Sequence, residues 1–145
     1  MEMTKDRAGV VTPPPELLAR MGALMRGYIA PSATGKARTQ AYMASVVLGK
    51  LALQLELTPG HEAAARAEGA TLQQDLHDLL GSGNEALARA VGALGERGGS
   101  EPLCGLVEEL YRARSALGEP LFDGALGRVR RALRADIDRR LEYAA

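Results

Sequence analysis

Few residues in this sequence have the types and spacing that carry out chemistry. The stretch Ala30–Ala37 partly matches a phosphate-binding loop, which needs Gly, four residues, and then Gly-Lys followed by Ser or Thr. Ala30 stands where that loop needs its first glycine, Ala37 stands where it needs a hydroxyl, and no strand is expected before it. A nucleotide site is therefore not predicted. Lys36 and Arg38 could still meet an anion, because helix N-termini attract negative charge.

Two histidines and one cysteine are the remaining residues of a catalytic or metal-binding type. His61 and His77 lie 16 residues apart on different turns, so they cannot form a ligand pair one turn apart, and we expect a solvated helix surface around them. Cys104 falls in the first turn of a predicted helix, where a helix N-terminus favours the reactive thiolate. However, no histidine is near it in sequence, and Cys is commonly a small buried hydrophobe. We therefore predict no catalytic residue, no metal site and no cofactor.

The last predicted helix is rich in arginine. Some of these side chains have an acidic residue four positions away, as in the pair Asp136 and Arg140. Arg128 and Arg131, with Arg134 nearby, lack such partners within a turn. Two interpretations stay open: an ordinary solvated face, or a docking face for an acidic partner or a phosphorylated ligand.

The elements that must position these residues are predicted to be helices. Apolar side chains recur every three or four residues, as in Phe122, Leu126, Val129 and Leu133, which is the period of an amphipathic helix. No segment alternates apolar and polar residues, so no strand is expected. The six expected helices cover roughly residues 13–28, 33–57, 58–80, 83–97, 100–117 and 119 to near the end of the chain.

Prolines and small polar residues predict the helix boundaries. Thr12 precedes three prolines, and Thr58-Pro59 repeats the pattern, which is typical of an N-cap followed by the first helical turn. Ser82 and Glu85 fit a capping box at the start of the fourth helix. Ala30-Pro31-Ser32 is expected to break the first helix.

The second predicted helix is the most apolar element. It keeps little polar face after Gln40, and a helix that is apolar nearly all round is normally central in its bundle. A seam of small residues along it lets a neighbouring helix approach closely: Ala41, Ser45, Gly49 and Ala52. The sequence therefore predicts an all-α, single-domain bundle of five to six helices over residues 12–145, with the second helix central and residues 1–11 as a flexible leader.

Composition and charge argue against several classes of protein. The 18 basic and 18 acidic residues cancel, whereas a nucleic-acid-binding domain is usually basic. The basic residues are mostly arginine, which fits either a GC-rich coding bias or bidentate recognition of carboxylate or phosphate. The longest apolar stretch, Ala41–Leu57, is interrupted by Lys50 and is too short and polar to span a membrane. The single cysteine and the lack of a signal segment predict a cytoplasmic protein.

Three stretches of the chain resemble a family of small bacterial all-helical proteins that carry a domain-of-unknown-function label. They are the first helix with the Ala-Pro that ends it, the two ends of the apolar helix, and the C-terminal segment. The residues concerned are Pro15-Glu16-Leu17-Leu18, Ala30-Pro31, Ala37-Arg38, Leu55-Glu56-Leu57, Leu133-Arg134-Ala135-Asp136, Arg140-Leu141 and Tyr143. The chain departs from the family at Glu142, because the family tends to place Asn-Pro before its aromatic residue.

The resemblance implies a role beside another protein. Members accompany aminoglycoside-phosphotransferase-like kinases and acyl-CoA dehydrogenases, and the assigned role is that of a small subunit supporting a kinase of hydroxyacyl-CoA. We therefore expect a non-catalytic accessory subunit with such a protein partner. The residues predicted to bind a partner or an anion are Lys36, Arg38, Arg128, Arg131 and Arg134. Three alternatives stay open: a helical bundle that binds a small apolar ligand, a structural homodimer, and a self-sufficient enzyme.

Overall fold

The computed structural model describes residues 11–144, which are helical apart from short connections and contain no strand. The predicted all-α fold class is confirmed. The expected leader lies outside the described residues except for Val11, which is non-helical and exposed. No helix within residues 11–144 is long and apolar enough to cross a membrane. The chain divides into two compact units, one ending at Glu56 and the other starting at Leu57.

The first unit begins with one continuous helical segment. It consists of α1 (Pro14–Leu24), the π-helical turn η1 (Met25–Ile29) and α2 (Ala30–Ser32). The predicted break at α2 is wrong, because the helix continues through Pro31. This proline directly follows the π-helical turn, in which the amide of Ala30 bonds to the carbonyl oxygen of Met25. The segment ends only at Ala33, whose backbone is extended.

The second and third predicted helices form a single long helix, α3 (Gly35–Leu80). The predicted boundary at Thr58-Pro59 is therefore wrong, since Pro59 lies inside the helix. A proline removes one backbone hydrogen bond from a helix interior. The alanine-rich sequence after His61 has a high helix propensity and favours continuation. The described part of the chain thus has five helical segments, where six were expected.

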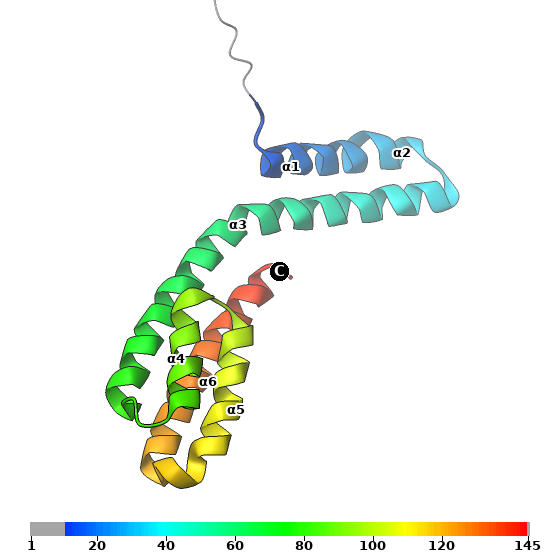
Figure 1. Ribbon diagram of the computed structural model, residues 1–145. Coiled ribbons are helices and arrows are strands. Elements are labelled where there is room, and N and C mark those ends of the chain that lie inside the picture. Colours follow the sequence, from blue (N-terminus) through cyan, green and yellow to red (C-terminus); the bar gives the residue numbers. More distant parts are fainter. Residues whose placement is uncertain (1–10, 145) are drawn as a thin grey trace, which may run out of the picture. The chain divides into compact units, whose positions relative to one another are not determined.

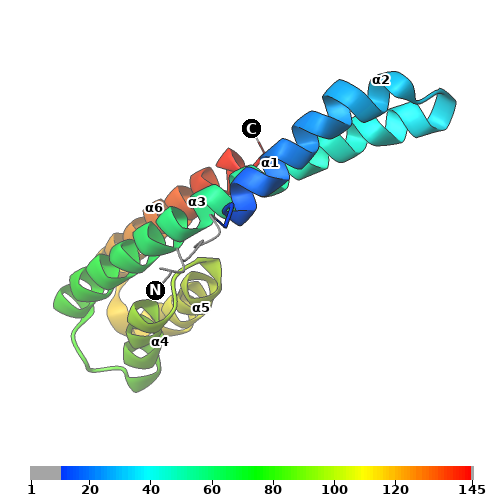
Figure 2. The ribbon, with the colours of Figure 1, turned by 90° about the horizontal axis from the view of Figure 1, so that it is seen from above.

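Small residues bring α1 and the first part of α3 together as an antiparallel hairpin (Figure 2). A Cβ atom added to Gly22 would lie 3.1 Å from the Ser45 carbonyl oxygen and 3.4 Å from the Cβ of Leu48. Ala41, Ser45 and Ala52 are buried. The predicted small-residue seam is therefore confirmed as a packing surface.

The predicted central position of the apolar helix is contradicted by its exposed side chains. Within the first unit, only the small-residue side of α3 is buried, and most of its large apolar side chains are about half exposed. Two helices can cover only one side of each other, so the remaining faces stay open. The exposed large apolar side chains of α3 are Tyr42, Met43, Val46, Val47, Leu51 and Leu55.

The second unit is a bundle of four helical segments that alternate in direction (Figure 1). The remainder of α3 is followed by α4 (Glu85–Glu96), α5 (Ser100–Leu117) and α6 (Glu119–Glu142). The connection between α5 and α6 is the single residue Gly118, whose φ of 81° is a conformation that side chains other than glycine rarely adopt. Short connections of this kind place consecutive helices side by side and antiparallel.

The start of α4 is capped by a different residue from the one predicted. The side chain of Asn84 accepts a hydrogen bond from the amide of Leu87 at 3.0 Å. Ser82 was expected to cap this helix, but α4 begins at Glu85, so Ser82 lies too far upstream. Asn and Ser are equally good N-cap residues. Both occur just before this helix, so the local sequence offered two candidates for the cap.

Leucine and valine fill the core of the second unit. Leu87, Val91 and Leu94 of α4 recur every three or four residues and are buried, and so are Leu106, Leu110 and Val129 from α5 and α6. Ile137 and Leu141 continue the four-residue spacing of the α6 stripe, but they are exposed. The far end of α6 is instead lined by polar residues. This polar end of the bundle contains the pocket described next.

Candidate functional site

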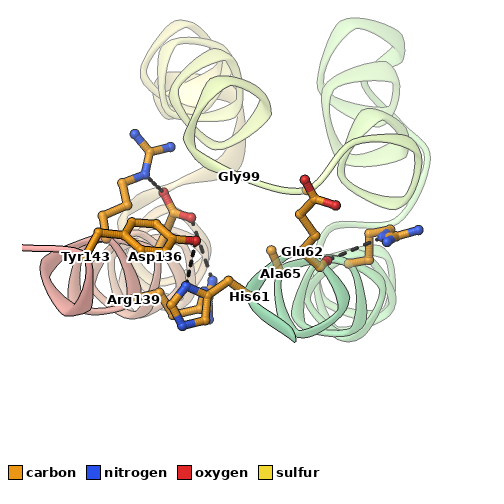
Figure 3. A pocket seen from close by; sticks show the side chains of 10 residues that line it. His61, Glu62, Ala65, Gly99, Asp136, Arg139 and Tyr143 are labelled. Atoms are coloured by element: carbon orange, nitrogen blue, oxygen red, sulfur yellow. Dashed lines mark hydrogen bonds and ion pairs between the residues drawn. The ribbon is translucent and has the colours of Figure 1, made fainter. Parts of the chain in front are cut away.

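A pocket of about 340 Å³ lies in the second unit between α3, the α4–α5 connection and α6. Seven of its ten lining residues have polar or charged side chains. Figure 3 shows His61 and Tyr143 facing each other, with Asp136 beside Tyr143. The lining residues are His61, Glu62, Ala65, Arg66, Gly98, Gly99, Asp136, Arg139, Arg140 and Tyr143.

His61 joins α3 to the end of α6. Its Nδ1 lies 2.8 Å from the hydroxyl of Tyr143, and its Nε2 lies 2.9 Å from Oε2 of Glu142. The two rings also contact each other, with centroids 5.0 Å apart. The expectation of a solvated surface around His61 is therefore wrong, whereas His77 is exposed as predicted. Both ring nitrogens of His61 already have a partner.

Asp136 is the buried carboxylate of the pocket, with 7% of its surface exposed. Nε of Arg140 lies 3.1 Å from its Oδ2, and a guanidinium nitrogen of Arg139 lies 3.8 Å from its Oδ1. Arg139 also contacts both carboxylate oxygens of Glu68 at 2.8 Å, and Arg140 donates to the Ser100 hydroxyl at 2.9 Å. Two arginines thus balance the buried charge, as burial of a carboxylate requires.

Glycine allows the α4–α5 connection to approach α3 at the edge of the pocket. A Cβ atom on Gly98 would lie 3.1 Å from the Cβ of Ala65 and 3.3 Å from the amide nitrogen of Arg66. Gly99 has a φ of 102°, a conformation that L side chains rarely adopt. The close approach therefore depends on the glycine pair that the sequence places between these helices.

Most polar groups of the pocket have a partner within it: His61, Asp136, Arg139 and Arg140 all contact neighbouring side chains. The buried Oδ2 of Asp136 is the exception among the described residues, because it lies near Arg140 but accepts no hydrogen bond. Within residues 11–144, no group of three or more His, Cys, Asp or Glu side chains is arranged to hold a metal ion. The arrangement is suited to fastening α6 to α3, and it leaves few polar atoms for a substrate.

The residues predicted to bind a partner or an anion fall in different units. Lys36 and Arg38 are exposed at the start of α3, and Arg38 lies over the Tyr42 ring, 6.0 Å from its centroid. Arg128 is half-buried and donates to the Gly124 carbonyl oxygen at 3.0 Å.

Arg131 and Arg134 are exposed on α6. The arginines of α6 that form ion pairs within residues 11–144 are Arg139 and Arg140. Two of the five predicted residues thus lie on α3 in the first unit, and three lie on α6 in the second. Cys104 is exposed rather than buried.

The clearest surface feature of the first unit is a set of exposed apolar side chains on both helices of the hairpin. On α1 and η1 they recur every three or four residues, which places them on one line along the helix. On α3 they recur every four residues, a spacing that turns by about 40° around the helix at each step. We call these side chains the hairpin face: Leu17, Met21, Leu24, Tyr28, Met43, Val47, Leu51 and Leu55.

Helix geometry places the two lines on the same side of the hairpin. Met21 immediately precedes Gly22, and Val47 immediately precedes Leu48, where Gly22 and Leu48 lie at the contact between the helices. One residue corresponds to a rotation of about 100° around a helix. Each line therefore lies about 100° before the helix contact, measured along its own chain direction. Because the two helices run antiparallel, these two offsets point to the same face of the hairpin. The spacing of the α1 line predicts an amphipathic helix, but a buried stripe and an exposed one have the same spacing.

No known protein family matches the sequence, and neither a curated protein nor a solved structure matches it.

Proposed function

We propose that this protein is a non-catalytic interaction subunit that binds another polypeptide through the hairpin face. The observation that carries the proposal is the row of eight large apolar side chains left half exposed on one side of a two-helix hairpin. Contiguous exposed apolar patches of several hundred square ångströms mark interaction sites on soluble proteins. Single exposed apolar side chains scattered over a surface would not indicate a binding site. Two neighbouring rows of them on one hairpin do.

The pocket of the second unit supports a structural role for its polar residues. A general base needs a free lone pair within reach of a substrate proton. Both nitrogens of His61 have partners in Tyr143 and Glu142, and the carboxylate of Asp136 is held between Arg139 and Arg140, although its buried Oδ2 accepts no hydrogen bond. We therefore favour an interaction protein over a self-sufficient enzyme.

The resemblance in the sequence suggests one particular partner. On that basis the partner would be an aminoglycoside-phosphotransferase-like kinase that acts on hydroxyacyl-CoA, or an acyl-CoA dehydrogenase beside it. Arg131 and Arg134 are exposed on α6 and could contribute a second, charged docking surface to such a complex. Arginine binds carboxylate and phosphate groups in bidentate fashion, which suits an acidic surface.

The test is affinity capture with two sets of variants of the tagged chain. We expect Val47→Glu to abolish capture of the bound polypeptide, because it places a charge in an apolar contact. Val46→Glu is the matched control, since Val46 is similarly exposed but points about 100° around the same helix from Val47. Capture that survives Val47→Glu but is lost when Arg131 and Arg134 are reversed to Glu would place the docking surface on α6 and overturn the proposal.

A further inference from the structure

We propose that the polypeptide bound by the hairpin face is a second copy of this chain, arranged antiparallel to the first so that two hairpins form a four-helix bundle. The inference rests on the proposed function, because it names the occupant of the same face; the kinase or dehydrogenase suggested by the resemblance would then bind outside this face. Three features of the first unit support it: the area of the face, the charges at the two ends of the hairpin, and the position of Val47 between those ends.

The area of the hairpin face is that of a dimer interface. Its eight side chains are between 43% and 71% exposed, which corresponds to about 100 Å² for each large apolar side chain. The face therefore offers roughly 800 Å², and a stable interface of standard size buries about 800 Å² on each partner. A second copy would cover the face with surface of the same kind, and a two-fold axis satisfies both copies at once.

The charges of the hairpin favour the antiparallel arrangement. The turn end, residues 26–38, carries Arg26, Lys36 and Arg38 and no acidic residue. The open end carries Glu16 and Glu56 together with Arg20 and Lys50, and Glu16 is paired with Arg20, so this end has no net charge. A parallel pair would place six positive charges together, and like charges at an interface are costly. An antiparallel pair instead separates the two basic turns and places each beside an open end of zero net charge.

The antiparallel arrangement predicts which residues approach each other. Gln40 immediately precedes buried Ala41 and so continues the line of the face toward the turn. Val47 lies about midway between Gln40 and Leu55 on the same line, so the two-fold axis passes near it. Gln40 of one copy then lies near Leu55 of the other. Within one copy these two residues are separated by about 22 Å of helix.

The first measurement is the mass of the full chain by sedimentation equilibrium. We expect twice the monomer mass of 15.3 kDa at micromolar concentration. Val47→Glu should raise the dissociation constant at least about 100-fold, because two like charges would meet near the axis. Val46→Glu should leave the dissociation constant within about threefold of the original, since it lies off the face. Circular dichroism should show both variants equally helical.

The second measurement fixes the orientation and does not depend on a destabilising substitution. In a Cys104→Ser background, chains carrying Gln40→Cys are mixed with chains carrying Leu55→Cys and oxidised. The antiparallel dimer gives the mixed disulfide in excess, whereas a parallel dimer gives Gln40→Cys chains joined to one another. Predominance of the parallel product would overturn the proposed arrangement.

The two proposals fail in distinguishable ways. A chain that stays monomeric at 100 micromolar, while capture of a different polypeptide depends on Val47, would overturn the dimer and leave the interaction role standing. A monomer whose capture is indifferent to Val47 would overturn both, because the face would then bind no polypeptide.

Discussion

His61 lies at the point where the last turn of α6 meets α3 within the second unit. Its ring nitrogens contact a hydroxyl and a carboxylate that belong to adjacent residues, Glu142 and Tyr143. Ile137 and Leu141 on the same helix are exposed. Polar contacts therefore hold the end of α6 where apolar packing has run out, and a net hydrogen bond of this type contributes about 1 kcal/mol.

We expect Tyr143→Phe to lower the free energy of unfolding of the second unit by about 1 kcal/mol, because it removes only the hydroxyl that contacts His61. His61→Ala should cost a similar amount, and the double variant little more than either. Urea unfolding followed by circular dichroism measures all three, with His77→Ala as the exposed control. Fully additive losses would show that the two side chains act independently.

The pocket shows which side-chain contacts a sequence can predict. The pair Asp136 and Arg140 was predictable because the residues are four apart on one helix. His61 and Tyr143 are 82 residues apart, and nothing in the local pattern of either relates them. The burial of Asp136 was also unpredictable, since its neighbours Arg139 and Arg140 are typical of a solvated helix.

At the scale of elements, the helices were predictable and some of their ends were not. Gly81 and Gly118 end helices as expected, because each adopts a positive φ that suits a helix end. The helix start predicted at Thr58-Pro59 was wrong. These two residues are compatible with a helix start and also with the interior of a helix that has lost one hydrogen bond. Local sequence alone does not decide between them.

The start of α4 offers a direct test of a corrected boundary. Asn84→Ala should destabilise the second unit by about 1 kcal/mol, because it removes the side chain that accepts from the Leu87 amide. Ser82→Ala should change the free energy of unfolding by less than about 0.5 kcal/mol. Thermal or urea unfolding of both variants gives the comparison. A larger loss at Ser82 than at Asn84 would restore the originally predicted cap.

At the scale of the whole molecule, the two units differ in what they bury. The second unit encloses leucines that are fully inaccessible, including Leu76, Leu94, Leu106 and Leu110. The hairpin of the first unit buries mainly small residues such as Ala30, and its large apolar side chains face outward. Sequence periodicity could not reveal this difference, because it indicates an apolar stripe without indicating what covers it.

Native-state hydrogen exchange should show the difference directly. We expect the amides of α1 to open with a free energy lower by about 2 kcal/mol or more than those of α5, since few apolar contacts hold the hairpin closed. Raising the protein concentration should slow exchange in α1 and leave α5 unchanged, because association stabilises the state that binds. Equal protection of α1 and α5 in dilute solution would contradict this expectation.

The residues described above also give the protein its own spectroscopic labels. The chain has four tyrosines and no tryptophan, and each unit contains two of them. Tyr28 lies on the hairpin face and Tyr42 on the same hairpin, while the Tyr143 hydroxyl contacts His61. Tyrosine emission, which is ordinarily masked by energy transfer to tryptophan, can thus be observed directly. Replacing Tyr28 and Tyr42 with Phe would confine the signal to the second unit, and replacing Tyr111 and Tyr143 would confine it to the first.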